Sequence, residues 1–243
     1  MVEIIIKAEE IFKIGNYVVT NSLILSFIVF LLLMVFALVV RSNIKLVPGK
    51  IQNAVEMILE AFLSLMNSVL GDRRKSEKYL PLIVTIFLFI LISNWLGLLP
   101  GVGSFILRTH EANIPIFRSP AADLNFTLAL AIIAVLATNF FGIVVLGIFK
   151  HIKKFLNFGS PIKFFVGILE FLSEISRVIS FSFRLFGNIF AGEVLLTIIF
   201  FLLPYIVPIP FLALEIFFGA IQAFIFSMLT LVFLASHTNQ TEH

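Results

Sequence analysis

The sequence predicts an all-α integral membrane protein with about five membrane-embedded helices and one amphipathic interfacial helix, the last two embedded helices forming a long, strongly tilted hairpin. Of its 243 residues, 60% are hydrophobic and only 13% are charged, whereas soluble domains carry roughly 25% charged residues. Apolar runs long enough to cross a bilayer recur along the chain. One of these runs is about twice the length of an upright span.

The elements follow in order within a single membrane domain, residues 1–243. The first apolar run, Leu23–Val40, ends at Arg41, and the second ends near Trp95, where an aromatic belt would place a tryptophan. Pro204, Pro208 and Pro210 separate the last two runs, because proline at this density breaks a helix. The expected elements are a first span at 21–41, an amphipathic helix at 50–71, spans at 79–99 and 123–150, and a tilted hairpin at 163–203 and 209–236.

The segment 50–71 differs from the spans. Its polar residues recur every three or four positions and form one stripe on an otherwise apolar helix. They are Asn53, Glu56, Glu60, Ser64 and Asn67. This pattern favours a helix that lies along the membrane interface. Packing against the other spans is the alternative.

The fourth run is too long for an upright helix. About forty helical residues measure roughly 60 Å, against a hydrocarbon core of about 30 Å. The helix therefore either breaks, at Gly187 or Gly192, or lies strongly tilted. No proline occurs between Phe164 and Leu203, so a continuous tilted helix is the simpler prediction.

Lysine and arginine counts predict the orientation. The loops 41–79 and 150–163 fall on one side and hold eleven of these residues, whereas the opposite side holds four. Because the richer side is usually cytoplasmic, we expect the N-terminus outside and the C-terminus in the cytoplasm.

Several classes of function are excluded. The chain has no cysteine, so it has no disulfide, thiolate metal site or thiol nucleophile. It has no glycine-rich phosphate loop and is not expected to bind ATP itself. The net charge of +3 comes from short loops, as in many membrane proteins, and does not indicate nucleic-acid binding. We expect no cofactor and no metal.

The fourth run carries ionisable residues where they are costly. Arg184 lies near its middle, and arginine cannot escape the bilayer by losing its proton. At 100° per residue, the polar residues Glu170, Arg177, Ser180 and Asn188 fall on the same face as Arg184. Residues of this kind at membrane depth usually mark an ion pathway.

Other polar residues lie nearer the two surfaces. Glu193 and Glu215 are expected near the outer face, and Gln222 near mid-depth with Arg184. Glu170 and Glu174 are expected on the inner side. The predicted layout is therefore two offset half-paths that meet at one fixed positive charge, so that something else must carry a cation past Arg184.

These residues resemble a known family. The run from Arg184-Leu-Phe-Gly-Asn188 to Glu193, followed by Gln222-Ala-Phe-Ile-Phe, is similar to the signature of the F-type ATP synthase a subunit. The segments Asn94-Trp-Leu-Gly-Leu-Leu-Pro100 and Ala122-Asp123-Leu-Asn125 look like that family's outer-side motifs. The resemblance is strongest from about Asn94 to the C-terminus.

The resemblance implies a membrane stator subunit of a rotary motor with no catalytic site of its own. It implies two half-channels for protons, with Arg184 as the essential charge facing a rotating c-subunit ring. The implied ion-pathway residues are Asn94, Asp123, Glu170, Glu174, Ser180, Asn188, Glu193, Glu215 and Gln222. The implied partners are the c-ring, the b-subunit peripheral stalk, the rest of the F-type ATP synthase and the lipid bilayer of the cell inner membrane.

One position departs from the family. Many bacterial members carry histidine where this chain has Glu215. Both outer relay positions are then acidic, which leaves open whether Glu193 or Glu215 is the main relay and whether H⁺ or Na⁺ is carried, since oxygen ligands suit hard cations. The alternative function is a stand-alone secondary transporter or ion channel. A secondary transporter usually shows paired halves, and this sequence shows none.

Overall fold

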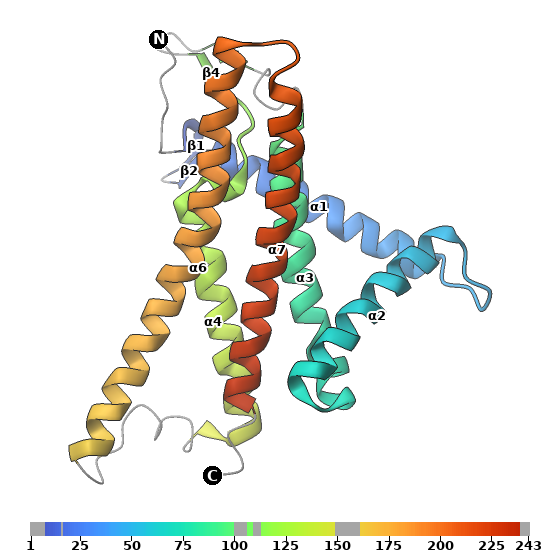
Figure 1. The fold of residues 1–243 in the computed structure, drawn as a ribbon, viewed down its shortest axis with the longest axis vertical. Coiled ribbons are helices and arrows are strands. Elements are labelled where there is room, and N and C mark those ends of the chain that lie inside the picture. The colour runs from blue at the N-terminus through green and yellow to red at the C-terminus, as the bar shows by residue number, and fades with distance from the viewer. Residues whose placement is uncertain (1–7, 16, 100–105, 109–112, 149–160, 239–243) are drawn as a thin grey trace.

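The computed structural model is a helical bundle with two small hairpins at one end (Figure 1). It describes residues 8–15, 17–99, 106–108, 113–148 and 161–238. The basic loop counted above at 150–163 and the end of the span expected at 123–150 lie partly outside these residues.

The first half of the chain begins with an antiparallel hairpin that the sequence analysis did not predict. Strands β1 (Glu10–Ile14) and β2 (Tyr17–Thr20) pair around Gly15, whose φ of +61° suits glycine. Helix α1 (Asn21–Ser42) follows directly, and the side chain of Thr20 caps it. Helix α2 (Lys50–Leu70) ends at Gly71, which is left-handed.

Helix α3 (Arg73–Gly97) begins before the apolar run because Asp72 caps a polar first turn by accepting a hydrogen bond from the Arg74 amide. Strands β3 (Ile106–Arg108) and β4 (Asn113–Pro115) form the second unpredicted hairpin. A 3-10 turn, η1 (Pro120–Ala122), leads into α4 (Leu124–Leu146), which ends at Gly147 with a φ of +83°.

The last two helices form the expected hairpin. Helix α6 (Pro161–Leu202) is one unbroken helix of 42 residues, and α7 (Pro208–Thr238) returns beside it after the proline-rich turn. At 1.5 Å per residue α6 is about 63 Å long, so it fits a hydrocarbon core of about 30 Å only when strongly inclined. In Figure 1 α6 accompanies α7 in its C-terminal half and leaves it toward its N-terminal end. The alternative, a break at Gly187 or Gly192, does not occur.

The bundle has two distinct ends. The hairpins and the α6–α7 turn lie at one end, here called the sheet end, and the start of α6 and the end of α7 lie at the other, here called the terminal end (Figure 1). The core lies where α3, α4, α6 and α7 meet, around Ile90, Ala131, Phe181, Leu185 and Phe226.

Six helices in the described part of the chain are long and apolar enough to cross a membrane by length and composition, α2 included. The predicted polar stripe of α2 is exposed throughout. Its opposite face buries Phe62, Met66 and Leu70 against α3 and α7. Helix α2 therefore packs on other helices with one face, as the alternative interpretation expects, and its position along the membrane interface stays a prediction.

Candidate functional site

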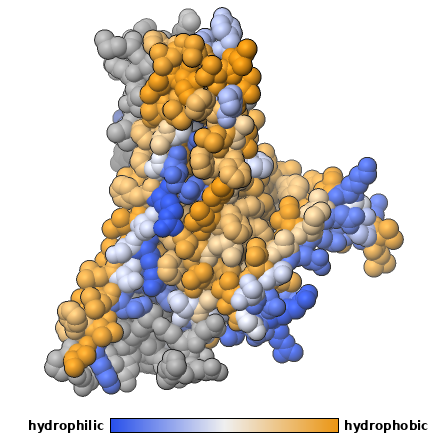
Figure 2. All heavy atoms as spheres, viewed as in Figure 1, coloured by the Kyte–Doolittle hydropathy of each residue, from blue (hydrophilic) through white to orange (hydrophobic). Residues whose placement is uncertain are grey.

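Arg184 lies on an outward-facing polar stripe of α6. The buried residues Phe181, Leu185 and Ile189 recur every four positions and turn one face of α6 toward the core. Ser180, Arg184 and Asn188 are consequently exposed on the flank. Figure 2 shows a hydrophilic band running along α6 across a largely apolar surface. This part of the predicted stripe therefore faces outward, whereas its other members, Glu170 and Arg177, are partly buried.

Two hydrogen bonds between residues four positions apart order this stripe. The Nη2 atom of Arg184 donates to the Ser180 hydroxyl at 3.3 Å. The side-chain amide of Asn188 donates to the Arg184 carbonyl at 2.9 Å. Neither partner is anionic, so neither contact offsets the positive charge of the guanidinium on the exposed flank. Such a charge is available to an acidic group on another molecule.

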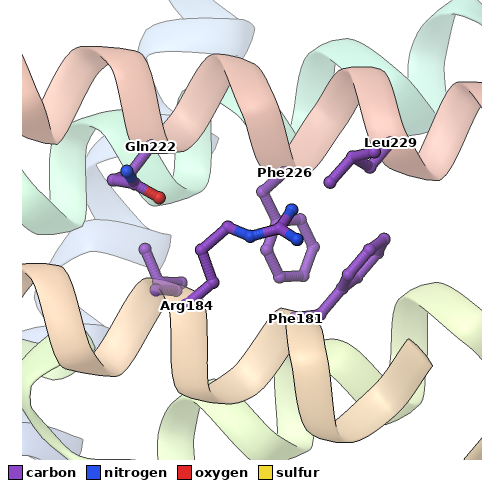
Figure 3. A pocket seen from close by; sticks show the side chains of 6 residues that line it. Phe181, Arg184, Gln222, Phe226 and Leu229 are labelled. Carbon is purple, nitrogen blue, oxygen red and sulfur yellow. The ribbon is translucent and has the colours of Figure 1, made fainter. Parts of the chain in front are cut away.

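Helix α7 brings Gln222 to the same place. A small pocket between α6 and α7 is lined by Arg184 and Gln222 and by the apolar side chains of Phe181, Leu185, Phe226 and Leu229. In Figure 3 Gln222 and Arg184 face each other from the two helices, and the guanidinium extends along the space between them. The expected proximity of Gln222 to Arg184 is therefore present.

The two acids Glu193 and Glu215 meet near the sheet end. The Glu215 carboxyl lies directly against Gly192, the residue before Glu193, where any Cβ would overlap it. Glu215 is only 5% exposed. Arg118, also buried, places its Nε 3.6 Å from Glu193 Oε2. A buried arginine thus holds one acid of the pair, and the absent side chain at Gly192 makes room for the other.

Several buried oxygens at this end accept no hydrogen bond from the described residues, although one of them, Glu193 Oε2, lies 3.6 Å from Arg118 Nε. Among the described residues, no hydrogen bond reaches the following buried oxygen atoms: Ser93 Oγ, Asn94 Oδ1, Ser119 Oγ, Glu193 Oε2 and Glu215 Oε1. A buried polar atom without a partner costs about 1–3 kcal/mol, and water or a cation normally satisfies it. This set of oxygens therefore suits a hydrated path for a cation.

Asn94 and Asp123 hold helices together at the same end. The Asn94 amide donates to the Gly219 carbonyl of α7 at 3.0 Å, and Trp95 Nε1 donates to Ile216 nearby at 3.1 Å. Asp123 caps α4 through the Asn125 amide and accepts a hydrogen bond from the Ser22 hydroxyl of α1 at 2.6 Å. Both residues thus join segments that are far apart in the sequence.

The inner acids Glu170 and Glu174 form a cluster near the terminal end with Arg177, Asn139 and His237. Arg177 Nη1 donates to Glu174 Oε1 at 2.8 Å, and Arg177 Nη2 lies 3.9 Å from Glu170. Asn139 of α4 donates to the other Glu174 oxygen at 3.3 Å. His237 Nε2 of α7 lies 3.0 Å from Glu174. Here, in contrast to the sheet end, both Glu174 oxygens have partners. Together these partners come from α4, α6 and α7.

This cluster contains enough ligand types to raise the question of a metal. Ligand atoms of Glu170, Glu174 and His237 lie within 4.8 Å of one another. However, Arg177 shares the cluster, and its guanidinium also covers the Phe233 ring at 4.3 Å. A permanent positive charge at this distance opposes a second cation. The cluster is better described as an ion-pair network.

Three residues that contact these acids were not predicted from the sequence as site residues. His237 and Asn139 were not singled out, and Arg118 was counted only as a loop charge. Nothing in the spacing of a single sequence places the end of α7 beside the middle of α4. Arg118 offered one signal, since it lies in a short apolar stretch five residues before Asp123.

Comparison with known proteins gives a consistent result. The family model described as ATP synthase A chain matches residues 23–235. A protein of Campylobacter concisus named ATP synthase subunit a is 38% identical over 219 residues, covering 89% of this chain and 88% of that protein. Proteins with the same name from Helicobacter pylori and Moorella thermoacetica are 37% and 30% identical, and the alignments cover 93% and 95% of this chain and 95% and 96% of those proteins.

Proposed function

Because the chain belongs to the ATP synthase A chain family, we propose that Arg184 is the charge on which its ion transport depends. The chain is a multi-pass membrane protein and the ion-translocating stator subunit of the Fo sector of an F-type ATP synthase, without a catalytic site of its own. The residue roles below are our proposal.

One observation carries the proposal. Arg184 is the exposed cation of a polar stripe on a helix far longer than the bilayer is thick. Within the described residues, its side chain donates a hydrogen bond to the neutral hydroxyl of Ser180. A permanent charge at mid-depth that contacts no acid among the described residues fits an acid that belongs to a partner.

We propose that this partner is the rotating c-subunit ring. As a carboxylate of the ring passes Arg184, the positive charge stabilises its ionised form and lowers its pKa, so that it releases its proton. Once the outer half-path has supplied a new proton, the neutral carboxyl can move away through the apolar bilayer as the ring turns. The membrane potential drives the process with about 2.3 kcal/mol per charge per 100 mV. The fixed charge also prevents cations from crossing without rotation.

The two half-paths are proposed on opposite sides of Arg184. The outer one uses Glu193 and Glu215, with Asn94 and Asp123 positioning the helices around them and Gln222 leading toward Arg184. The inner one follows Ser180 and Glu170 along the α6 stripe. Glu174 lies beside the inner path, and its paired environment supports a positioning role in that path. Asn188 continues the stripe on the other side of Arg184.

Orientation and further partners complete the proposal. The sheet end faces outside and the terminal end faces the cytoplasm of a bacterial cell, with α2 along the interface. The b-subunit peripheral stalk is the second proposed membrane partner. The stand-alone transporter is less favoured, because the outward-facing charge of Arg184 calls for a second protein.

Cross-linking tests the proposed position of the ring. Because the chain has no cysteine, a single Asn188→Cys change can be paired with one cysteine at mid-membrane in the c subunit. Oxidation of assembled membranes should yield an a–c dimer. Leu136→Cys is the matched control, since Leu136 is also exposed but lies on α4. A dimer with Leu136→Cys and none with Asn188→Cys would contradict the proposal.

Co-purification separates the competing functions. An affinity tag on this chain should recover a c-ring and an ATP-hydrolysing head. Recovery of the chain by itself, with ion transport that does not require ATP hydrolysis by a head, would favour the stand-alone transporter. Measuring ATP-driven acidification with and without Na⁺ in the same preparation would identify the coupling ion.

A further inference from the structure

The N-terminal segment brings an additional acid to the outer half-path. Glu9 lies immediately before β1, and its backbone carbonyl accepts a hydrogen bond from the Asn21 amide at 3.1 Å. The Asn21 side chain extends between Glu9 Oε2, at 3.5 Å, and the Pro115 carbonyl, at 3.3 Å. Asn21 is completely buried. The Glu9 carboxyl is therefore fixed between the start of α1 and the segment that leads to Arg118.

Arg118 links Glu9 to the pair of acids described above. Burial raises the pKa of the Glu9 carboxyl above its ordinary value, and the positive charge of Arg118 opposes this rise. Arg118 also lies 3.6 Å from Glu193. Since Glu215 lies against the residue before Glu193, Arg118, Glu193 and Glu215 form one group. Glu9 is joined to the segment that carries Arg118 through Asn21 and the Pro115 carbonyl.

Two further observations point to a ligand in this group. Glu215 is nineteen-twentieths buried with Oε1 unpartnered among the described residues, and the buried Ser119 hydroxyl beside Arg118 is unpartnered as well. Three acids against one arginine leave an excess of negative charge, which attracts protons or cations. The other described charges on β1, Glu10 and Lys13, lie 3.6 Å apart and offset each other.

We propose that Glu9 is the acid at the mouth of the outer half-path, where its carboxylate collects the transported proton and passes it toward Glu193 and Glu215. Arg118 positions the acids on either side of it. This inference rests on the proposed function, because it assumes that Glu193 and Glu215 form the outer route. It adds the N-terminal segment, which lies outside the matched residues 23–235, to that route.

The Glu9→Gln variant provides the first test. Glu9→Gln keeps an oxygen that can accept from Asn21 but removes the negative charge. In vesicles of the whole complex whose lumen faces the sheet end, ATP synthesis driven by a fixed total driving force should fall about tenfold at high lumenal pH, where proton collection limits the rate. The deficit should shrink as lumenal pH falls, and Glu9→Asp should retain most of the rate.

Glu10→Gln is the matched control, because Glu10 is the adjacent acid and is exposed. It should show the wild-type rate at every pH. A wild-type profile for Glu9→Gln would overturn the inference, and so would an equal loss at all pH values, which indicates a purely structural contribution.

A cysteine variant covers the case in which Glu9→Gln fails to assemble. In this cysteine-free chain, Glu9→Cys can be modified after assembly with an anionic or a cationic thiol reagent. The anionic adduct should restore transport at high lumenal pH and the cationic adduct should reduce it. Equal rates with both adducts would overturn the inference.

Two variants in the same membranes keep the outcomes distinguishable. Loss of transport in Glu193→Gln together with a wild-type Glu9→Gln profile refutes only the role of Glu9. Full coupled transport in Arg184→Ala would instead refute the proposed function itself.

Discussion

The two groups of ionisable residues in this protein contain similar residue types but differ in how completely their carboxylates are paired with hydrogen-bond donors. Near the sheet end, Glu193 and Glu215 each keep a buried oxygen without a hydrogen bond from the described residues, and the single arginine contact measures 3.6 Å. Near the terminal end, Glu174 accepts a hydrogen bond from Arg177 at 2.8 Å, and Asn139 and His237 also contact its carboxylate.

This difference in pairing predicts that one group transports ions and the other stabilises the packing of the helices. A fully paired buried carboxylate stabilises the packing of the helices that supply its partners, and it exchanges protons reluctantly because its ionised form is favoured. A buried carboxylate with an unpartnered oxygen can accept a proton, water or a cation. We therefore expect the sheet-end acids to affect mainly transport, and Glu174 to affect mainly stability.

The largest expected effect comes from the charge between the two groups. Arg184→Ala should abolish coupled ion transport while the subunit remains assembled in the membrane, because no other described residue supplies a permanent charge at this place on the stripe. Arg184→Lys should substitute poorly, since a desolvated amine can lose its proton. ATP-driven acidification of vesicles measures the effect. Pumping by Arg184→Ala at the normal rate would contradict the role of this residue.

The second prediction tests the sheet end. Glu193→Gln and Glu215→Gln should each slow transport, and the double variant should be slower than either, because both acids serve one route. Thermal stability of the complex should change little, since neither carboxylate is fully paired. Wild-type transport in both single variants and in the double variant would refute the outer relay.

The third prediction tests the terminal end. Glu174→Ala leaves Arg177 and His237 without their closest acid. It should lower the free energy of unfolding by about 3 kcal/mol, the lower end of the range for breaking a buried ion pair. Glu170→Ala is the matched control in the same cluster, since it lies 3.9 Å from Arg177 and is more exposed. It should cost less than about 1 kcal/mol but should slow transport. Resistance to heat and to protease, measured beside pumping, checks both.

A reversal of these two results would contradict the contrast between the sheet-end acids and the terminal-end cluster. If Glu174→Ala stopped transport without loss of stability, the terminal-end cluster would itself be part of the conducting route.

The smallest expected effect is on the geometry of the sheet-end pair. Gly192→Ala introduces a Cβ that overlaps the Glu215 carboxyl. Because this is the end of a flexible side chain, the carboxyl can move, and we expect a modest loss of transport with stability almost unchanged. Gly49→Ala, where an added Cβ meets nothing, is the control. Transport equal to the control would show that the position of Glu215 against α6 is unimportant.

Much of the architecture follows from patterns along the chain. Hydrophobic run length and the proline cluster at 204–210 predicted the membrane helices and the turn between the last two, because the bilayer imposes a length on each span. The absence of proline from Phe164 to Leu203 predicted an unbroken α6, which the structure confirms. The β1–β2 and β3–β4 hairpins were missed, because strands of three to five residues give too little periodicity to detect.

The sequence alone determined which residues share a helix face, and hence that Arg184 lies on one polar stripe with Ser180 and Asn188, since helical periodicity is a local property. Only the tertiary structure decided which ionisable groups meet across helices. Glu215 meets Gly192 and His237 meets Glu174 because α6 and α7 pack together. Arg118 meets Glu193 because the segment before η1 packs against α6. Helix packing is set by the fit of many side chains at once, and no spacing along a single chain records it.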